Sequence, residues 1–140
     1  MRARSPSFES LDQVADATAT NLSQAAAASA YELFRDENFR RCAGLERLSQ
    51  VEQDRTFNEL VVGYLVLFML LLEAPDLRVP EELRNYPAGV HNRISPAYVE
   101  HLRTLGVEPE HLRGWEKLIS MRYEEYARQA RGAGGRLGTK

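Results

Sequence analysis

The chain has 140 residues, of which 44% are hydrophobic and 27% charged, an ordinary balance for one globular domain. Its formal net charge of −2 excludes a general electrostatic attraction to nucleic acid or to anionic lipid. The single cysteine, Cys42, cannot form an internal disulfide, which suits a reducing cytosol. No apolar segment follows the basic N-terminal residues, and Glu9 and Asp12 come too early for a signal peptide. We therefore expect a cytoplasmic protein.

The first third of the chain predicts a long helix with one face of small side chains. Residues 5–7, Ser-Pro-Ser, offer a capping serine and a first-turn proline, so we expect the helix to begin there. Residues 36–38 are expected to bend or end it, and residues 39–48 to continue helically, with Gly44 as a break. Much of the apolar face is alanine, which lets another helix approach closely. Helical spacing places eight residues on this face: Phe8, Leu11, Ala15, Ala19, Leu22, Ala26, Ala30 and Leu33.

Residues 60–72 form an uninterrupted apolar run between Glu59 and Glu73, which predicts a helix that is apolar on every side and must be enclosed. Upstream, Ser49 and Glu52 match a capping box, and downstream Pro75 is expected to end the helix near Ala74. The run has 13 residues, and a membrane span needs about 20. We therefore expect no membrane span but a second helix that crosses the middle of a protein core.

The remaining chain predicts a loop and two further helices. Residues 76–94 contain two prolines and are expected to be a loop with one short helix at 80–85. Ser95-Pro96 is expected to open a third helix that ends at Gly106 in the left-handed conformation, and Pro109 to open a fourth. The prediction is an all-α bundle of about four main helices with a central apolar helix and a proline-containing loop. We expect one helical domain over residues 1–131 and a flexible glycine-rich tail over 132–140.

Residues 98–117, two helical patterns around a glycine turn, have the dimensions of a helix-turn-helix. Within them, residues 105–116 resemble the recognition-helix segments of bacterial regulators. A DNA-binding regulator is therefore one alternative, with His111, Arg113 and Lys117 as its nucleic-acid contacts. Three acids, Glu108, Glu110 and Glu116, would face the phosphates, so nucleic acid is not the favoured partner.

Glu108 and His111 are spaced as in half of a ferritin-like metal site. A complete site needs a second Glu-x-x-His pair, and neither His91 nor His101 has a glutamate at that spacing. A ferritin-like metal-binding bundle is thus a second alternative, with Glu108 and His111 as its ligands. The favoured interpretation has no metal and no cofactor.

A pocket for a small carboxylate ligand is a further alternative, lined by tyrosines with one histidine and one arginine. Catalysis has little support, because the sequence contains no serine-elbow motif, no glycine-rich phosphate loop and no histidine near Cys42. No residue is therefore assigned a catalytic role. The pocket residues would be Tyr98, His101, Arg122, Tyr123 and Tyr126.

The favoured function is non-enzymatic association of helices, either between copies of this chain or with another helical protein. The apolar run has a wider surface than one neighbouring helix covers, and the alanine face invites close helix packing. Burial of apolar surface would supply the free energy of association. The predicted interface residues are Ala19, Ala26, Ala30, Leu65, Phe68 and Leu72.

Overall fold

The computed structural model describes residues 10–74 and 77–138, with side chains as far as residue 132. In these residues all regular structure is helical, which confirms the all-α prediction. The five α-helices are α1 (Leu11–Arg35), α2 (Glu37–Ala43), α3 (Gln50–Leu72), α4 (Tyr86–Thr104) and α5 (Pro109–Gly138). Two short 3-10 helices, η1 (Leu45–Arg47) and η2 (Glu81–Leu83), lie in the connections.

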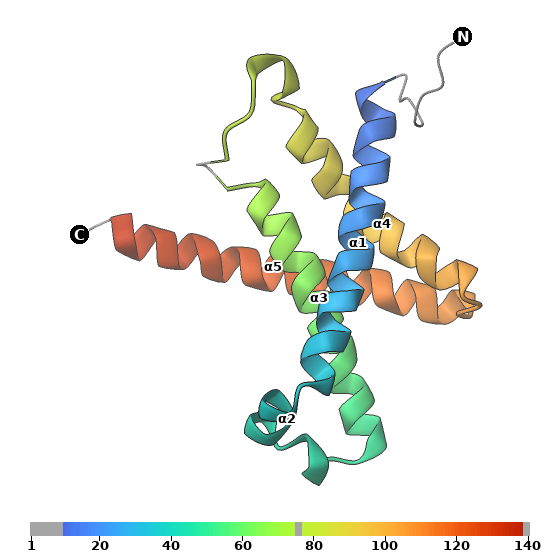
Figure 1. Cartoon of the computed structure of the whole chain (residues 1–140). Coiled ribbons are helices and arrows are strands. Elements are labelled where there is room, and N and C mark those ends of the chain that lie inside the picture. Colours follow the sequence, from blue (N-terminus) through green and yellow to red (C-terminus); the bar gives the residue numbers. More distant parts are fainter. Residues whose placement is uncertain (1–9, 75–76, 139–140) are drawn as a thin grey trace.

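Helices α1 and α3 lie side by side and are joined at one end by α2 and η1 (Figure 1). Helix α4 packs mainly on α1, and α5 crosses α3 rather than running along it (Figure 1). The core lies where the four long helices meet, and its fully buried side chains include Leu65, Ile94 and Ile119. Because α5 crosses α3, it covers only part of that helix. The predicted central apolar helix is therefore confirmed, but one of its sides is left open.

Several predicted helix ends are confirmed with the expected hydrogen bonds. The Ser49 hydroxyl accepts from the Glu52 amide at 3.2 Å and the Glu52 carboxylate accepts from the Ser49 amide at 3.2 Å, which completes the capping box. Asp36 ends α1 and caps α2, where its carboxylate accepts from the Phe39 amide at 2.8 Å. Gly106 has φ +91°, and the Val107 amide donates to the Leu102 carbonyl at 3.1 Å. This is the predicted Schellman turn between α4 and α5.

The predicted start of the third helix at Ser95-Pro96 is wrong, because Pro96 lies inside α4, which begins at Tyr86. Pro87 occupies the first turn, where its missing amide costs nothing. Buried side chains then recur every four residues from Val90 through Ile94 and Tyr98 to Leu102. Pro96 is exposed, so the carbonyl that loses its helical partner faces water. Burial of this continuous face stabilises α4 by more than Pro96 destabilises it.

Both ends of the chain also differ from the predictions. Helix α1 begins at Leu11, capped by Ser10, whereas the predicted cap at 5–7 lies outside the described residues. Helix α5 continues to Gly138, through the glycine-rich residues that we expected to form a tail. Glycine lowers helix propensity by about 1 kcal/mol relative to alanine but does not forbid a helix.

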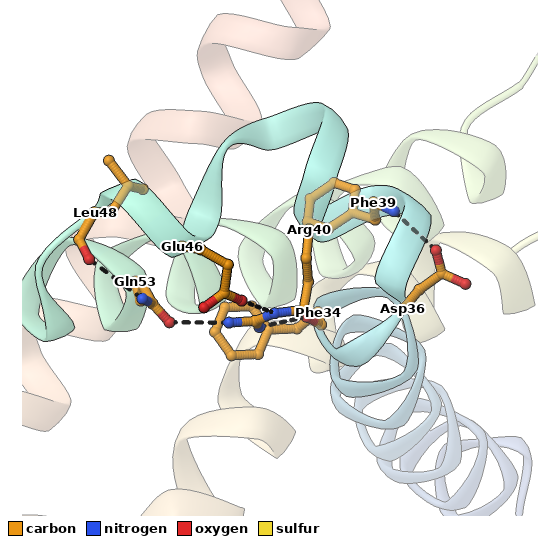
Figure 2. Close-up of polar contacts among 7 residues, drawn as sticks. All are labelled: Phe34, Asp36, Phe39, Arg40, Glu46, Leu48 and Gln53. Carbon is orange, nitrogen blue, oxygen red and sulfur yellow. Dashed lines mark hydrogen bonds and ion pairs between the residues drawn. The ribbon is translucent and has the colours of Figure 1, made fainter.

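Arg40 ties the ends of α1 and α3 together through the α2–η1 connection (Figure 2). Its guanidinium donates to the Phe34 carbonyl at 2.9 Å, to the Gln53 side chain at 3.1 Å and to the Glu46 carboxylate at 2.7 Å. Gln53 in turn donates to the Leu48 carbonyl at 3.2 Å. The planar guanidinium of arginine directs its N–H donors at all three acceptors. The ammonium group of lysine does not reproduce this arrangement of donors.

We expect Arg40→Ala to lower the free energy of unfolding by about 2 kcal/mol, because two half-buried acceptors lose a charged donor. Arg40→Lys should recover less than half of this loss. The matched control is Arg41→Ala, since Arg41 is exposed and its guanidinium donates to the exposed Asn38 side chain at 3.3 Å. Urea unfolding followed by circular dichroism measures the three variants. Equal stabilities for Arg40→Ala and Arg41→Ala would contradict the assigned role of Arg40.

Candidate functional site

One side of α3 is buried and the opposite side is apolar and open. The buried side consists of Val61, Val62, Leu65, Val66 and Met69. Leu67 and Leu71, on the other side, are 47% and 55% exposed. We call this side the outward face of α3; helical spacing assigns it Leu60, Gly63, Tyr64, Leu67 and Leu71, of which Leu60 and Tyr64 are half-buried and also pack against the core.

The acids at the two ends of the apolar run are paired with side chains of their own chain. Arg122 of α5 forms two hydrogen bonds to the Glu59 carboxylate, at 2.9 and 3.0 Å. Tyr123 donates to the Glu73 carboxylate, and Nε2 of His91 lies 2.6 Å from an oxygen of the same group. Between Glu59 and Glu73 the helix has no charged residue. The outward face is therefore an apolar surface whose two terminal acids have partners within the chain.

By length and composition alone, α3 also meets the criteria for a membrane-spanning helix. All 23 residues count toward its length, and its best 18-residue window has a mean hydropathy of 1.6, with 28% of the window buried. The sequence prediction considered only the 13 apolar residues and so judged the segment too short. Core helices of soluble proteins meet the same criteria, so this finding does not establish a membrane span.

The residues predicted to face a partner lie inside the chain. Ala19, Ala26, Ala30 and Leu65 have no exposed surface, because α1 packs its alanine face against α3 and α4. Phe68 and Leu72 are half-buried against the same core. The alanines do permit close helix packing, but within one molecule. In this fold the fully buried residues are unavailable to a second molecule, which corrects the predicted interface.

The five residues of the predicted ligand pocket do not converge. Tyr98 is buried, with its ring edge-to-face against Trp115 at 5.4 Å and 6.5 Å from the half-buried ring of His101. Arg122 is held by Glu59, and Tyr123 points to Glu73, while Tyr126 packs at the core edge. A hollow of about 830 Å³ does include Tyr123, but none of the other four residues lines it.

Glu73, His91 and Tyr123 form a polar cluster in that hollow, where the end of α3 meets α4 and α5. Nδ1 of His91 lies 3.1 Å from the Asn92 side-chain oxygen, and its ring lies 5.2 Å from that of Tyr123. The contact between Nε2 and Glu73 lacks hydrogen-bond geometry and is an ion pair when the imidazole is protonated. Nε2 of His91 is therefore buried against a carboxylate without a hydrogen-bond partner among the described residues. The cluster fixes the end of α3.

Two tyrosines make the folded state sensitive to alkali. Burial raises the pKa of Tyr98 to about 12, and burial together with Glu73 raises the pKa of Tyr123 to about 12. Because both pKa values exceed the ordinary tyrosine pKa of 10.0, the two tyrosines ionise more easily in the unfolded chain than in the folded one. Their contribution to the free energy of unfolding is therefore complete below pH 10 and is lost between pH 10 and 12.

Between pH 8 and pH 11 we expect the free energy of unfolding to fall by about 1 kcal/mol less in Tyr98→Phe than in the wild type. Urea unfolding at the two pH values measures this, with Tyr31→Phe as the control because Tyr31 is exposed. The same loss in Tyr98→Phe and in the wild type would show that Tyr98 does not carry the effect.

The helix-turn-helix residues lie on helices much longer than that motif, with 19 residues in α4 and 30 in α5. His111, Arg113 and Lys117 are all exposed. Arg113 and Lys117 share a side of α5, but Glu110 and Glu124 lie seven residues to either side of Lys117 on that same side. The structure therefore brings together no basic surface at the predicted contacts.

Glu108 and His111 are both exposed at the start of α5. In the described part of the chain, no group of three or more histidine, cysteine, aspartate or glutamate side chains is placed to hold a metal ion. The half-motif found in the sequence therefore has no partner from another helix among these residues.

The sequence singled out α3 but not the residues of its open side. Gly63, Leu67 and Leu71 were not singled out, because a segment that is apolar all round does not reveal its outward side. One signal was present: three of the five buried residues of the run are valines, whereas Leu67 and Leu71 lie opposite them.

No protein-family model matches the chain, and no curated protein or solved structure is significantly similar to it.

Proposed function

We propose that this protein is a non-enzymatic interaction module whose outward face of α3 packs against a helix of another molecule. One observation supports this most strongly. Leu67 and Leu71 are about half exposed in the middle of a 13-residue segment without a charge. Soluble proteins rarely leave a contiguous apolar face uncovered, and such faces mark interaction sites.

The geometry of the face suits a helix as its partner. Its five residues follow one line along α3, about 16 Å long at the usual helical rise. Its two terminal acids already have partners within the chain, so neither presents an unpaired carboxylate to a partner that covers the face. An apolar stripe of this shape is filled by an amphipathic helix through residues spaced three and four apart.

The proposal is tested with a synthetic, fluorescently labelled helix whose leucines lie on one side and whose other side is polar. We expect saturable binding, measured by fluorescence anisotropy, that Leu67→Glu weakens at least about tenfold. Met121→Glu is the matched control, since Met121 is 50% exposed on α5 away from the site. Equal binding by both variants would overturn the proposal. So would binding to phosphatidylcholine vesicles in place of the helix, because it would assign the face to lipid.

A further inference from the structure

The connection between α1 and α3 is longer than the packing of these two helices requires. Neighbouring helices of a bundle are commonly joined by about 2–8 residues. Here residues 36–49 separate the end of α1 at Arg35 from the start of α3 at Gln50. They fold into α2 and η1, and the fully buried Leu45 anchors η1. A connection held on a rigid pair of helices in this way is a common position for binding residues.

This connection borders a hollow of about 800 Å³ around which arginines gather. Four arginines and two glutamates line it, so it has an excess of two positive charges in a chain whose formal net charge is −2. A basic residue near the end of a helix is favoured by the helix dipole, but that preference does not make four of them share one hollow. We call it the arginine hollow; its charged residues are Arg35, Glu37, Arg40, Arg41, Glu46 and Arg47.

Contacts within the chain leave most of this positive charge without a carboxylate partner. Arg40 forms an ion pair with Glu46 at 2.7 Å, and its guanidinium lies between the ends of α1 and α3 (Figure 2). With that pair set aside, three arginines and one glutamate remain, so the excess of two positive charges is unchanged. Arg41 donates to the neutral side chain of Asn38 at 3.3 Å. The side chain of Arg47 makes no hydrogen bond or ion pair with the described residues.

We propose that the arginine hollow binds a small anion that carries two or more phosphate groups. The planar fork of N–H donors in arginine matches phosphate oxygens two at a time, so guanidiniums without a carboxylate partner suit such a ligand. Arg41 comes from α2 and Arg47 from η1, and linked phosphates can contact both where one phosphate group contacts one. The bonds of Arg40 hold α2 and η1 in place before a ligand binds. The site does not involve the outward face of α3, so it is independent of the function proposed above.

The chain contains its own reporter for this site. Cys42 is exposed, lines the arginine hollow and is the single cysteine of the sequence. We expect pyrophosphate, added at constant ionic strength, to slow the reaction of Cys42 with the uncharged reagent N-ethylmaleimide in a saturable manner. Inorganic phosphate should need a concentration at least about tenfold higher for half of the effect, because it offers one phosphate group instead of two.

Two variants and a matched control locate the effect. Arg41→Gln and Arg47→Gln should each raise the half-saturating concentration of pyrophosphate at least about fivefold. Arg113→Gln should leave it unchanged, since Arg113 is also an exposed arginine without a side-chain partner among the described residues but lies on α5, outside the hollow. Arg40 is left intact because it holds the connection together. The absence of a saturable effect, equal half-saturation by the two anions, or equal effects of Arg47→Gln and Arg113→Gln would overturn the proposal.

Discussion

Leu65→Ala is expected to lower the free energy of unfolding by about 3–4 kcal/mol, whereas Leu67→Ala, two residues away, should lower it by less than about 1 kcal/mol. Leu65 is completely buried, so its truncation leaves a cavity in the core. Leu67 is 47% exposed, so its truncation leaves none. The two substitutions change helix propensity equally, and their difference therefore reports which side of α3 faces the core.

Urea unfolding at low micromolar concentration measures this pair, because association adds little to stability in dilute solution. A larger loss for Leu67→Ala than for Leu65→Ala would mean that the helix is rotated from the orientation described. Equal and small losses would mean that α3 is not a core helix.

Ala26→Leu is expected to lower the free energy of unfolding by about 3 kcal/mol, with almost no effect of Ala25→Leu. Ala26 is completely buried in the contact of α1 with the core, and a larger side chain must push the helices apart. Ala25, its neighbour, is exposed, and leucine there meets solvent. The same pair of variants shows whether the alanine face lines the chain's own core or contacts another molecule.

If the alanines formed an interface between molecules, Ala26→Leu would weaken association and leave the dilute monomer unchanged. If they line the chain's own core, the monomer itself becomes less stable. Urea unfolding combined with sedimentation at one concentration distinguishes the two. A stable monomer of Ala26→Leu would contradict the packing described.

The elements that the sequence predicted well are those fixed by a few neighbouring residues. The capping box of Ser49 and Glu52, the helix end at residue 36 and the left-handed Gly106 depend on side chains and backbone within one turn, and the structure confirms them. The start of α4 depends on residues that lie farther apart in the sequence. Ser95-Pro96 is a typical helix start, but Pro96 lies on the exposed side of a helix whose buried face begins much earlier.

The side of α3 that stays open could not be predicted, because it depends on how whole helices cross. Leu65, Phe68 and Leu72 are spaced as one helical face, as are Leu60, Leu67 and Leu71, and the sequence does not say which face α1 and α5 cover. The packing of α1 and α4 and the crossing of α5 decide it, together with ion pairs such as that between Arg122 and Glu59.

The central claim is that the alanine face of α1 lies inside one chain while the outward face of α3 is free to be covered by another molecule. Thiol labelling of Ala26→Cys and Leu67→Cys, each with Cys42→Ser, tests this most directly. We predict that the thiol at position 26 reacts only as fast as the chain unfolds, at every protein concentration. The thiol at position 67 should react quickly in the protein alone and more slowly when the synthetic amphipathic helix is added. Rapid labelling at position 26, or labelling at position 67 that is slow even at high dilution, would contradict the account.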